Sequence, residues 1–392
     1  MSLTPFRHVL VGLALCTTSL ALADDAAIYK ERWDAFLKAP GQVSFGPLET
    51  VEGASAKGLP CSAKPGIAAA ALAEADAYAA ANKSSTLIVW RKGKIEYARY
   101  YGDRNADSLL VSKSMAKPIT AIAVGRAIKL GYIKSLDQSL ADFIPEWRDT
   151  PKAAIKLRYL LDMRSGMLEQ GFSPDPDHPL NRAYLDTDHG HQIIHNYPLV
   201  TTPGSAYGYA NVPSELVAVV IERATGMRYA KFVGDQVLKP IGARGGKVWV
   251  DREGGLAHSG CCMHLPAESW LRLGLLLLKD GKIGSQQLLP KGYVSEMRRG
   301  TAQNPHFGLG IWIGSPWQER RGFGAPGRPG PQVLHSEPYL DPDLFLFDGN
   351  SNQVLYLSPK YDLAILRMGD TPPAQPEWDN ARLPNLIMRA IK

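Results

Sequence analysis

Several patterns that mark common classes of protein do not occur in this 392-residue sequence. It contains no Gly-x-Ser-x-Gly, which excludes a nucleophile-elbow hydrolase, and no His-Glu-x-x-His, which excludes the helical zinc-protease signature. Its net charge of +6 is mild and comes with neither an arginine-rich arm nor an aromatic–basic array, so we expect no nucleic-acid partner. Beyond the N-terminus no apolar run reaches membrane-spanning length, so we expect no stable insertion into a membrane.

Cysteine is also scarce, with four residues in the whole sequence. Cys61, Cys261 and Cys262 lie outside the N-terminal segment described next. For an exported protein the spacing favours one disulfide, from Cys61 to one of the neighbouring pair, although the sequence does not say which. No supporting base lies near any of them, so we do not expect a catalytic thiol.

The first 23 residues have the pattern of a secretory signal. Arg7 and His8 precede a short apolar run, and Ala21-Leu22-Ala23 is a small-x-small cleavage pattern before Asp24. We therefore predict a signal peptide over 1–23, cleavage near Ala23, and a periplasmic or secreted protein. Residues 24–65 are rich in Gly, Pro and Ala and should form an N-terminal arm, followed by a single domain over 66–392.

The order of local patterns predicts an α+β fold. Strand patterns at 86–90 and 95–101 precede a long helical middle, and strands return at 308–313, 354–357 and 363–368 before a final helix. Such an order predicts one antiparallel sheet built from both chain ends and flanked by helices, with a helical lobe inserted at about 132–265. A cleft between sheet and lobe would be the natural site.

A serine and a lysine lie at that junction. Ser114 and Lys117 stand three residues apart at the start of an apolar segment, so a helix would place them one turn apart on one face. A hydroxyl beside a buried, neutral amine is the arrangement of an activated nucleophile. The pattern alone is also compatible with a helix cap and a solvated lysine. Pro118 adds a local strain, because its missing N–H faces the Ser114 carbonyl if the helix begins at Ser114.

Two histidine-containing segments are candidates for further functional sites. A loop-rich stretch contains Asp186, Asp188, His189, His191 and His195. Such a cluster raises the possibility of zinc, but mixed His/Asp clusters in polar loops are usually solvated, and we predict no metal and no cofactor. We interpret His258-Ser259-Gly260 as a loop at the rim of the cleft.

Several ordered motifs together resemble the serine β-lactamase and penicillin-binding protein superfamily. The likeness is strongest to its class C-like branch, which includes carboxylesterases and 6-aminohexanoate-dimer hydrolases. It rests on Ser114-Met115-Ala116-Lys117, Leu160-Leu161-Asp162-Met163-Arg164-Ser165-Gly166, Pro203-Gly204 leading to Tyr209-Ala210-Asn211, and Ile221-Glu222-Arg223-Ala224-Thr225-Gly226.

The resemblance implies roles for particular residues. Ser114 would be the acylated nucleophile, Lys117 its basic partner, Tyr209 a phenol that shuttles the proton, and Asn211 a substrate-binding amide. The third motif of the superfamily corresponds to Gly349-Asn350-Ser351-Asn352-Gln353, in which we expect Asn350 and Ser351 to bind substrate. Asn350 replaces the usual cation or imidazole there, which argues against recognition of a β-lactam carboxylate.

The expected function is an exported serine hydrolase that cleaves a small ester, amide or peptide-like substrate through an acyl-enzyme on Ser114. A β-lactamase or D,D-peptidase is an alternative, as is a non-catalytic protein that binds cell wall or another ligand. The sequence leaves open the substrate, the oligomeric state, and whether Lys117 or Tyr209 is the general base.

Overall fold

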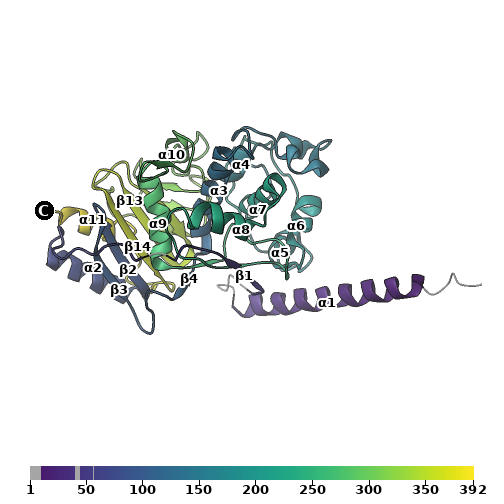
Figure 1. Cartoon of the computed structure of the whole chain (residues 1–392), viewed down its shortest axis with the longest axis horizontal. Coiled ribbons are helices and arrows are strands. Elements are labelled where there is room, and N and C mark those ends of the chain that lie inside the picture. The colour runs from purple at the N-terminus through teal and green to yellow at the C-terminus, as the bar shows by residue number, and fades with distance from the viewer. Residues whose placement is uncertain (1–9, 40–44, 56) are drawn as a thin grey trace, which may run out of the picture.

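The computed structural model describes residues 10–39, 45–55 and 57–392, with side chains from residue 24 onward (Figure 1). The predicted signal peptide therefore lies outside the described side chains, and only the backbone of its later part is seen, in α1 (Leu10–Lys38). Among the helices of the described part, none has both the length and the apolar character needed to cross a bilayer.

A six-stranded antiparallel sheet joins the two ends of the chain, which confirms the predicted architecture. Its strands in order are β3 (Lys94–Tyr100), β2 (Ser84–Arg91), β14 (Leu363–Gly369), β13 (Gln353–Ser358), β12 (Phe345–Gly349) and β9 (Trp312–Ile313). The central strands are buried along nearly their whole length, because helices cover both faces. The covering helices are α2 (Ala69–Ala81) and α11 (Arg382–Arg389) on one side and α9 (Ala267–Leu278) on the other (Figure 1).

The helical lobe packs beside this sheet (Figure 1). Its helices are α4 (Leu157–Leu161), α5 (Pro179–Leu185), α6 (His189–His191), α7 (Val212–Thr225) and α8 (Tyr229–Val233). The central helix α7 begins with Pro213 in its first turn and ends at Gly226, whose φ of 69° is the left-handed conformation that commonly stops a helix. Ten consecutive residues of α7 are buried, which explains why its sequence is almost continuously apolar.

A second, four-stranded sheet joins the arm to the lobe. No strand was predicted in the part of the lobe that contributes to this sheet. Its order is β1 (Leu48–Val51), β5 (Gly246–Trp249), β6 (Met263–Pro266) and β4 (Leu109–Val111). Each strand has at most four residues, and β5 and β6 are bounded by Gly246 and Pro266, which are usually turn signals. Shorter elements elsewhere are β7 (Lys282–Ile283), β8 (Gln286–Gln287), α10 (Tyr293–Met297), β10 (Arg320–Gly322) and β11 (Gln332–Leu334).

The chain passes from β4 into the segment that carries Ser114. A 3₁₀ turn over Lys113–Ala116 comes first, and α3 (Lys117–Lys129) follows it. The Lys117 N–H bonds the Ser114 carbonyl in the 3₁₀ manner, and Pro118 falls in the first turn of α3, where no N–H is needed. The strain expected at Pro118 therefore does not arise.

Candidate active site

Three acceptor or hydroxyl groups surround the buried amine of Lys117. Its Nζ lies 2.7 Å from Asn211 Oδ1, 3.1 Å from the Gly260 carbonyl oxygen and 3.2 Å from Ser114 Oγ. Lys117 is 1% exposed and begins α3, Ser114 lies in the 3₁₀ turn just before it, and Asn211 caps α7, which packs against α3. The structure therefore brings Ser114, Lys117 and Asn211 into one cluster.

The number of N–H groups on Lys117 decides what this cluster can do. A neutral amine has two N–H groups and one lone pair, and the two carbonyl oxygens of Asn211 and Gly260 accept both N–H groups. The lone pair is then left for the Ser114 hydroxyl. Burial lowers the pKa of Lys117 to about 7, against the raising effect of the Glu215 carboxylate, so much of the amine is neutral near neutral pH.

Tyr209, two residues before Asn211 in the same motif, is the fourth side chain of the cluster. Its ring lies 4.9 Å from Lys117 Nζ and packs among Phe307, Trp312 and Phe323. Burial raises the pKa of Tyr209 well above its ordinary value, and the nearby Ser114 side chain lowers it only in part. The hydroxyl makes no hydrogen bond of normal geometry with a described residue, although Ser114 is near enough to affect it. The phenol is thus a protonated group facing Ser114, suited to donate a proton.

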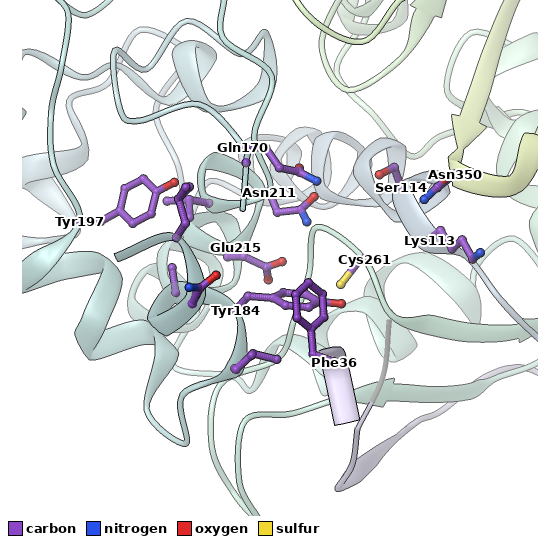
Figure 2. Close-up of a pocket in the computed structure, with 16 residues that line it drawn as sticks. Phe36, Lys113, Ser114, Gln170, Tyr184, Tyr197, Asn211, Glu215, Cys261 and Asn350 are labelled. Atoms are coloured by element: carbon purple, nitrogen blue, oxygen red, sulfur yellow. The ribbon is translucent and has the colours of Figure 1, made fainter. Parts of the chain in front are cut away.

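A cavity of about 220 Å³ opens at Ser114 (Figure 2). Asn211 and Asn350 both border it, as sequence analysis expected of substrate-binding residues. Ser351 instead lies behind the lining: it is 5% exposed and its hydroxyl bonds Thr371 Oγ1 at 2.7 Å. The rest of the lining comes from α1, α5, α7 and the loops beside them, and includes Phe36, Leu180, Tyr184, Tyr197 and Glu215.

Lys113 supplies a cation that the sequence analysis missed at the third motif. Its Nζ lies 2.5 Å from Ser351 Oγ, and among the described residues no carboxylate forms a salt bridge with it. Asn350 does replace the motif cation in sequence, but an ammonium reaches the same loop from the residue just before Ser114. Lys113 has a left-handed φ of 47°, which a linear motif cannot reveal.

Glu215 was not predicted from the sequence either, although its spacing from Asn211 indicates a shared helix face. It lies four residues after Asn211 on α7, hence on the same helix face, and it is 1% exposed. Burial raises its pKa to about 7, and His189 and Lys117 oppose the rise. Glu215 is an acidic residue inside an otherwise apolar helix, one turn after a motif residue. This pattern could have identified it as a candidate site residue.

The predicted rim position of His258 is wrong. The imidazole is fully buried, and its ring stacks on Trp249 with centroids 3.6 Å apart and on His189 at 3.9 Å. Burial lowers its pKa far below the ordinary value, so the ring is neutral. The loop after β5 turns back on that strand, with the His258 N–H bonded to the Trp249 carbonyl, and this places the imidazole on the indole ring.

His189, Glu215 and His258 have the donor types of a zinc site. Their ligand atoms lie within 4.8 Å of one another in the part of the chain that the structure describes. The two imidazoles, however, stack with an interplanar angle of 13°, so their lone pairs lie in parallel planes and do not converge on one ion. His191 and His195 of the sequence cluster are exposed and contact each other instead. The geometry therefore favours a cluster of buried polar side chains over a metal centre.

The predicted disulfide from Cys61 is also wrong. Cys261 and Cys262 are bonded to each other, and Cys61 is free and exposed. Cys61 lies beside Ile95 of β3, at the edge of the main sheet, whereas Cys261 and Cys262 pack with Trp249 in the lobe. A disulfide requires close Cα atoms, which sequence spacing does not establish.

The comparisons with known proteins agree with this geometry. The sequence profile described as Beta-lactamase matches residues 68–383, and the chain belongs to that family. The fold agrees with this family membership, because it is shared with solved structures of the β-lactamase type.

Individual relatives make the likeness more specific. Esterase EstB of Burkholderia gladioli is 31% identical over 177 residues, which cover 40% of this chain and 45% of EstB. Penicillin-binding protein 4* of Bacillus subtilis is 28% identical over 189 residues, covering 42% of this chain and 38% of that protein. The matches thus span less than half of each curated relative. A candidate 6-aminohexanoate-dimer hydrolase from Bacillus anthracis shares the fold, with a TM-score of 0.65 and 18% identity over 87% of this chain and 89% of its own.

Proposed function

We propose that the protein hydrolyses small carboxylic esters or amides through an acyl-enzyme on Ser114. The observation that carries this proposal is the 3.2 Å approach of Lys117 Nζ to Ser114 Oγ, in a position where a neutral amine would direct its two N–H groups at the carbonyl oxygens of Asn211 and Gly260. A lone pair beside a hydroxyl is what general-base activation of serine requires. The relation to esterase EstB supports an ester as substrate.

The proposed proton route uses Lys117 as base and Tyr209 as donor. Lys117 takes the Ser114 proton as Oγ attacks the carbonyl carbon. The tetrahedral intermediate collapses, the bond to the leaving group breaks, and the Tyr209 hydroxyl protonates that group. The Lys117 ammonium then returns a proton to the phenolate, and water later hydrolyses the acyl-enzyme. The raised pKa of Tyr209 supports its role as donor, because the phenol is protonated in the resting site.

The oxyanion would form against the backbone of the Ser114 turn. The end of β12 approaches this turn so closely that a Cβ on Gly349 would lie 3.2 Å from the Ser114 nitrogen. A glycine there keeps space open beside the Ser114 N–H, one of the two donors that an oxyanion hole requires.

The test is covalent labelling of Ser114. A fluorophosphonate probe should add one adduct to the wild-type protein, and Ser114→Ala should lose the adduct and at least about 10³-fold of p-nitrophenyl acetate hydrolysis. Intact-mass spectrometry and an initial-rate assay measure both. Ser205→Ala, on an exposed loop serine, is the matched control and should label normally. Full labelling of Ser114→Ala would overturn the proposal.

A β-lactamase or D,D-peptidase is the second candidate, because Lys113 brings an ammonium to the third-motif loop at Ser351. A cation there could pair with the carboxylate of such substrates. Nitrocefin turnover at about 1 s⁻¹ or faster would favour this activity. The 3.2 Å contact between Ser114 and Lys117 argues against the non-catalytic alternative, which gives no reason for that geometry.

We also propose that the protein is exported, on the strength of the 1–23 sequence pattern. Cell fractionation with N-terminal sequencing tests this, and we expect a mature chain that begins at Asp24.

A further inference from the structure

Glu215 presents an unsatisfied carboxylate to the cavity. It is 1% exposed, and within the described structure neither of its oxygens has a hydrogen bond of normal geometry. The nearest N–H groups are those of Ser259 and Gly260, which only partly offset the effect of burial on its pKa. Buried polar groups in folded proteins nearly always have a partner, so the missing partner points to a ligand. Figure 2 shows the carboxylate within the lining, between Asn211 and Tyr184.

When Lys117 is neutral, no ammonium lies beside this carboxylate in the described structure, and His189 is the neighbour that most opposes the rise of its pKa. Lys117 is the lysine that acts on Glu215, but it must be neutral to act as a base. His258 is neutral, and His189 lies 3.9 Å away with its other ring nitrogen bonded to Asp251 at 3.0 Å. His189 stands beyond hydrogen-bond distance, and a buried carboxylate without a hydrogen-bonded partner is costly, so a cation that enters the cavity would gain a strong interaction with Glu215.

The walls around Glu215 suit an organic cation. Phe36, Tyr184 and Tyr197 place three aromatic side chains in the same cavity, with Leu180 and Val212 beside them. Aromatic rings attract ammonium groups through their negative faces and also tolerate the alkyl groups these cations carry. Because Glu215 is one helical turn from Asn211, its Cβ lies about 5–6 Å from that of Asn211, within reach of a short acyl chain.

We propose that this end of the cavity is a subsite for an ammonium group on the acyl part of the substrate, with Glu215 as its counter-ion. The inference rests on the proposed acylation of Ser114 and narrows its substrates to short acyl groups that end in a cation. Glu215 would then determine specificity, while Ser114, Lys117 and Tyr209 carry out the bond cleavage.

The test compares two esters of the same shape. The p-nitrophenyl ester of 4-(trimethylammonio)butyrate carries a cation where the ester of 5,5-dimethylhexanoate carries a neutral carbon. For the wild type we expect kcat/KM to be about tenfold or more higher for the cationic ester, and we expect Glu215→Gln to bring the ratio close to one. Using the ratio within each variant removes any general loss of activity. Glu222→Gln, on the same helix but away from the cavity, should keep the wild-type ratio.

A second measurement does not depend on the variant folding. Tetramethylammonium chloride should inhibit wild-type hydrolysis of the neutral ester competitively, and sodium chloride at equal ionic strength should not. A wild-type ratio near or below one, or a high ratio that persists in folded Glu215→Gln, would overturn the subsite. Neutral-ester turnover that depends on Ser114 would still support the hydrolase, so the two proposals can fail separately.

Discussion

Lys117 and Glu215 share a buried environment in which each alters the other's protonation. Burial penalises both charges, while each charge stabilises the opposite one, and burial brings each pKa to about 7. The groups that face them from neighbouring elements are Tyr209, His189 and His258. The protonation of this pair, more than that of Ser114, should control the dependence of activity on pH.

The pH profile of kcat/KM for a neutral ester should therefore have an acid limb near pH 7. Lys117 acts only when deprotonated, so the rate falls as pH drops through its pKa. Glu215→Gln removes the negative charge that raises this pKa, and the limb should move to lower pH by about one unit or more. Rates measured from pH 5 to 9 test this, with Glu222→Gln as the control. A limb that stays in place or moves upward would contradict the assigned role of Lys117.

Residues in linear motifs could be predicted and residues recruited by packing could not. Ser114 and Lys117 are three apart, which places them on one face of a helix, and Tyr209 and Asn211 are two apart, which places them on one side of an extended segment. Lys113 reaches Ser351 across 238 positions of sequence, and only the folded chain makes that contact. Glu215 lay within a predicted helix, yet nothing in a single sequence shows that its carboxylate faces a cavity.

At the scale of elements, the loop between β12 and β13 is held by a buried arginine. Arg367 on β14 is fully buried and donates to the carbonyls of Ser351 at 2.7 Å, Asn352 at 3.1 Å and Asp370 at 2.9 Å. Ser351 and Asn352 both have positive φ, which these carbonyl contacts help to maintain. The arginine thus positions the loop that carries Asn350 into the cavity.

Replacing Arg367 by methionine should lower the free energy of unfolding by about 3 kcal/mol or more, because several buried carbonyls lose their donor. Urea unfolding measures this loss. Arg382→Met is the control, since Arg382 is half exposed and its contact with Glu74 is 3.6 Å long, and it should cost less than about 1 kcal/mol. Equal losses for the two variants would show that Arg367 does not hold the loop.

Long elements were easier to predict than short ones. The strands near 86–90 and 363–368 and the helical middle of the chain carry enough apolar residues to show their period, and the structure has β2, β14 and α7 there. Strands β5 and β6 form because pairing with β1 and β4 satisfies their backbone groups. Their stability comes from partners distant in sequence, so local pattern could not reveal them.

At the scale of the whole molecule, the N-terminal arm is part of the catalytic cavity. Arg32 of α1 is buried and donates to the carbonyls of Leu185 at 3.0 Å, Gly46 at 3.0 Å and Asp251 at 2.6 Å. These bonds fix α1 against the lobe, and Phe36, one turn further on, then borders the cavity. From the sequence this stretch was expected to be an arm outside the domain, with no role in the site.

Phe36→Ala should open this wall. We expect kcat/KM for p-nitrophenyl hexanoate to fall about fivefold, equivalent to roughly 1 kcal/mol of lost apolar contact, and that for the acetate to change little. An acyl-length series measures the difference. Leu37→Ala provides the control, because Leu37 on the same helix is 50% exposed. A uniform effect on all chain lengths would indicate a distorted site and not a lost wall.

The position of α1 has a practical consequence for handling the enzyme. An affinity tag fused at Asp24 would lie within a few helical turns of the substrate, whereas the C-terminal residue Lys392 bonds the Gly66 carbonyl at the opposite end of the molecule (Figure 1). A purification handle at the carboxyl end would therefore stand farther from the Ser114 cavity than one on the helix that borders it.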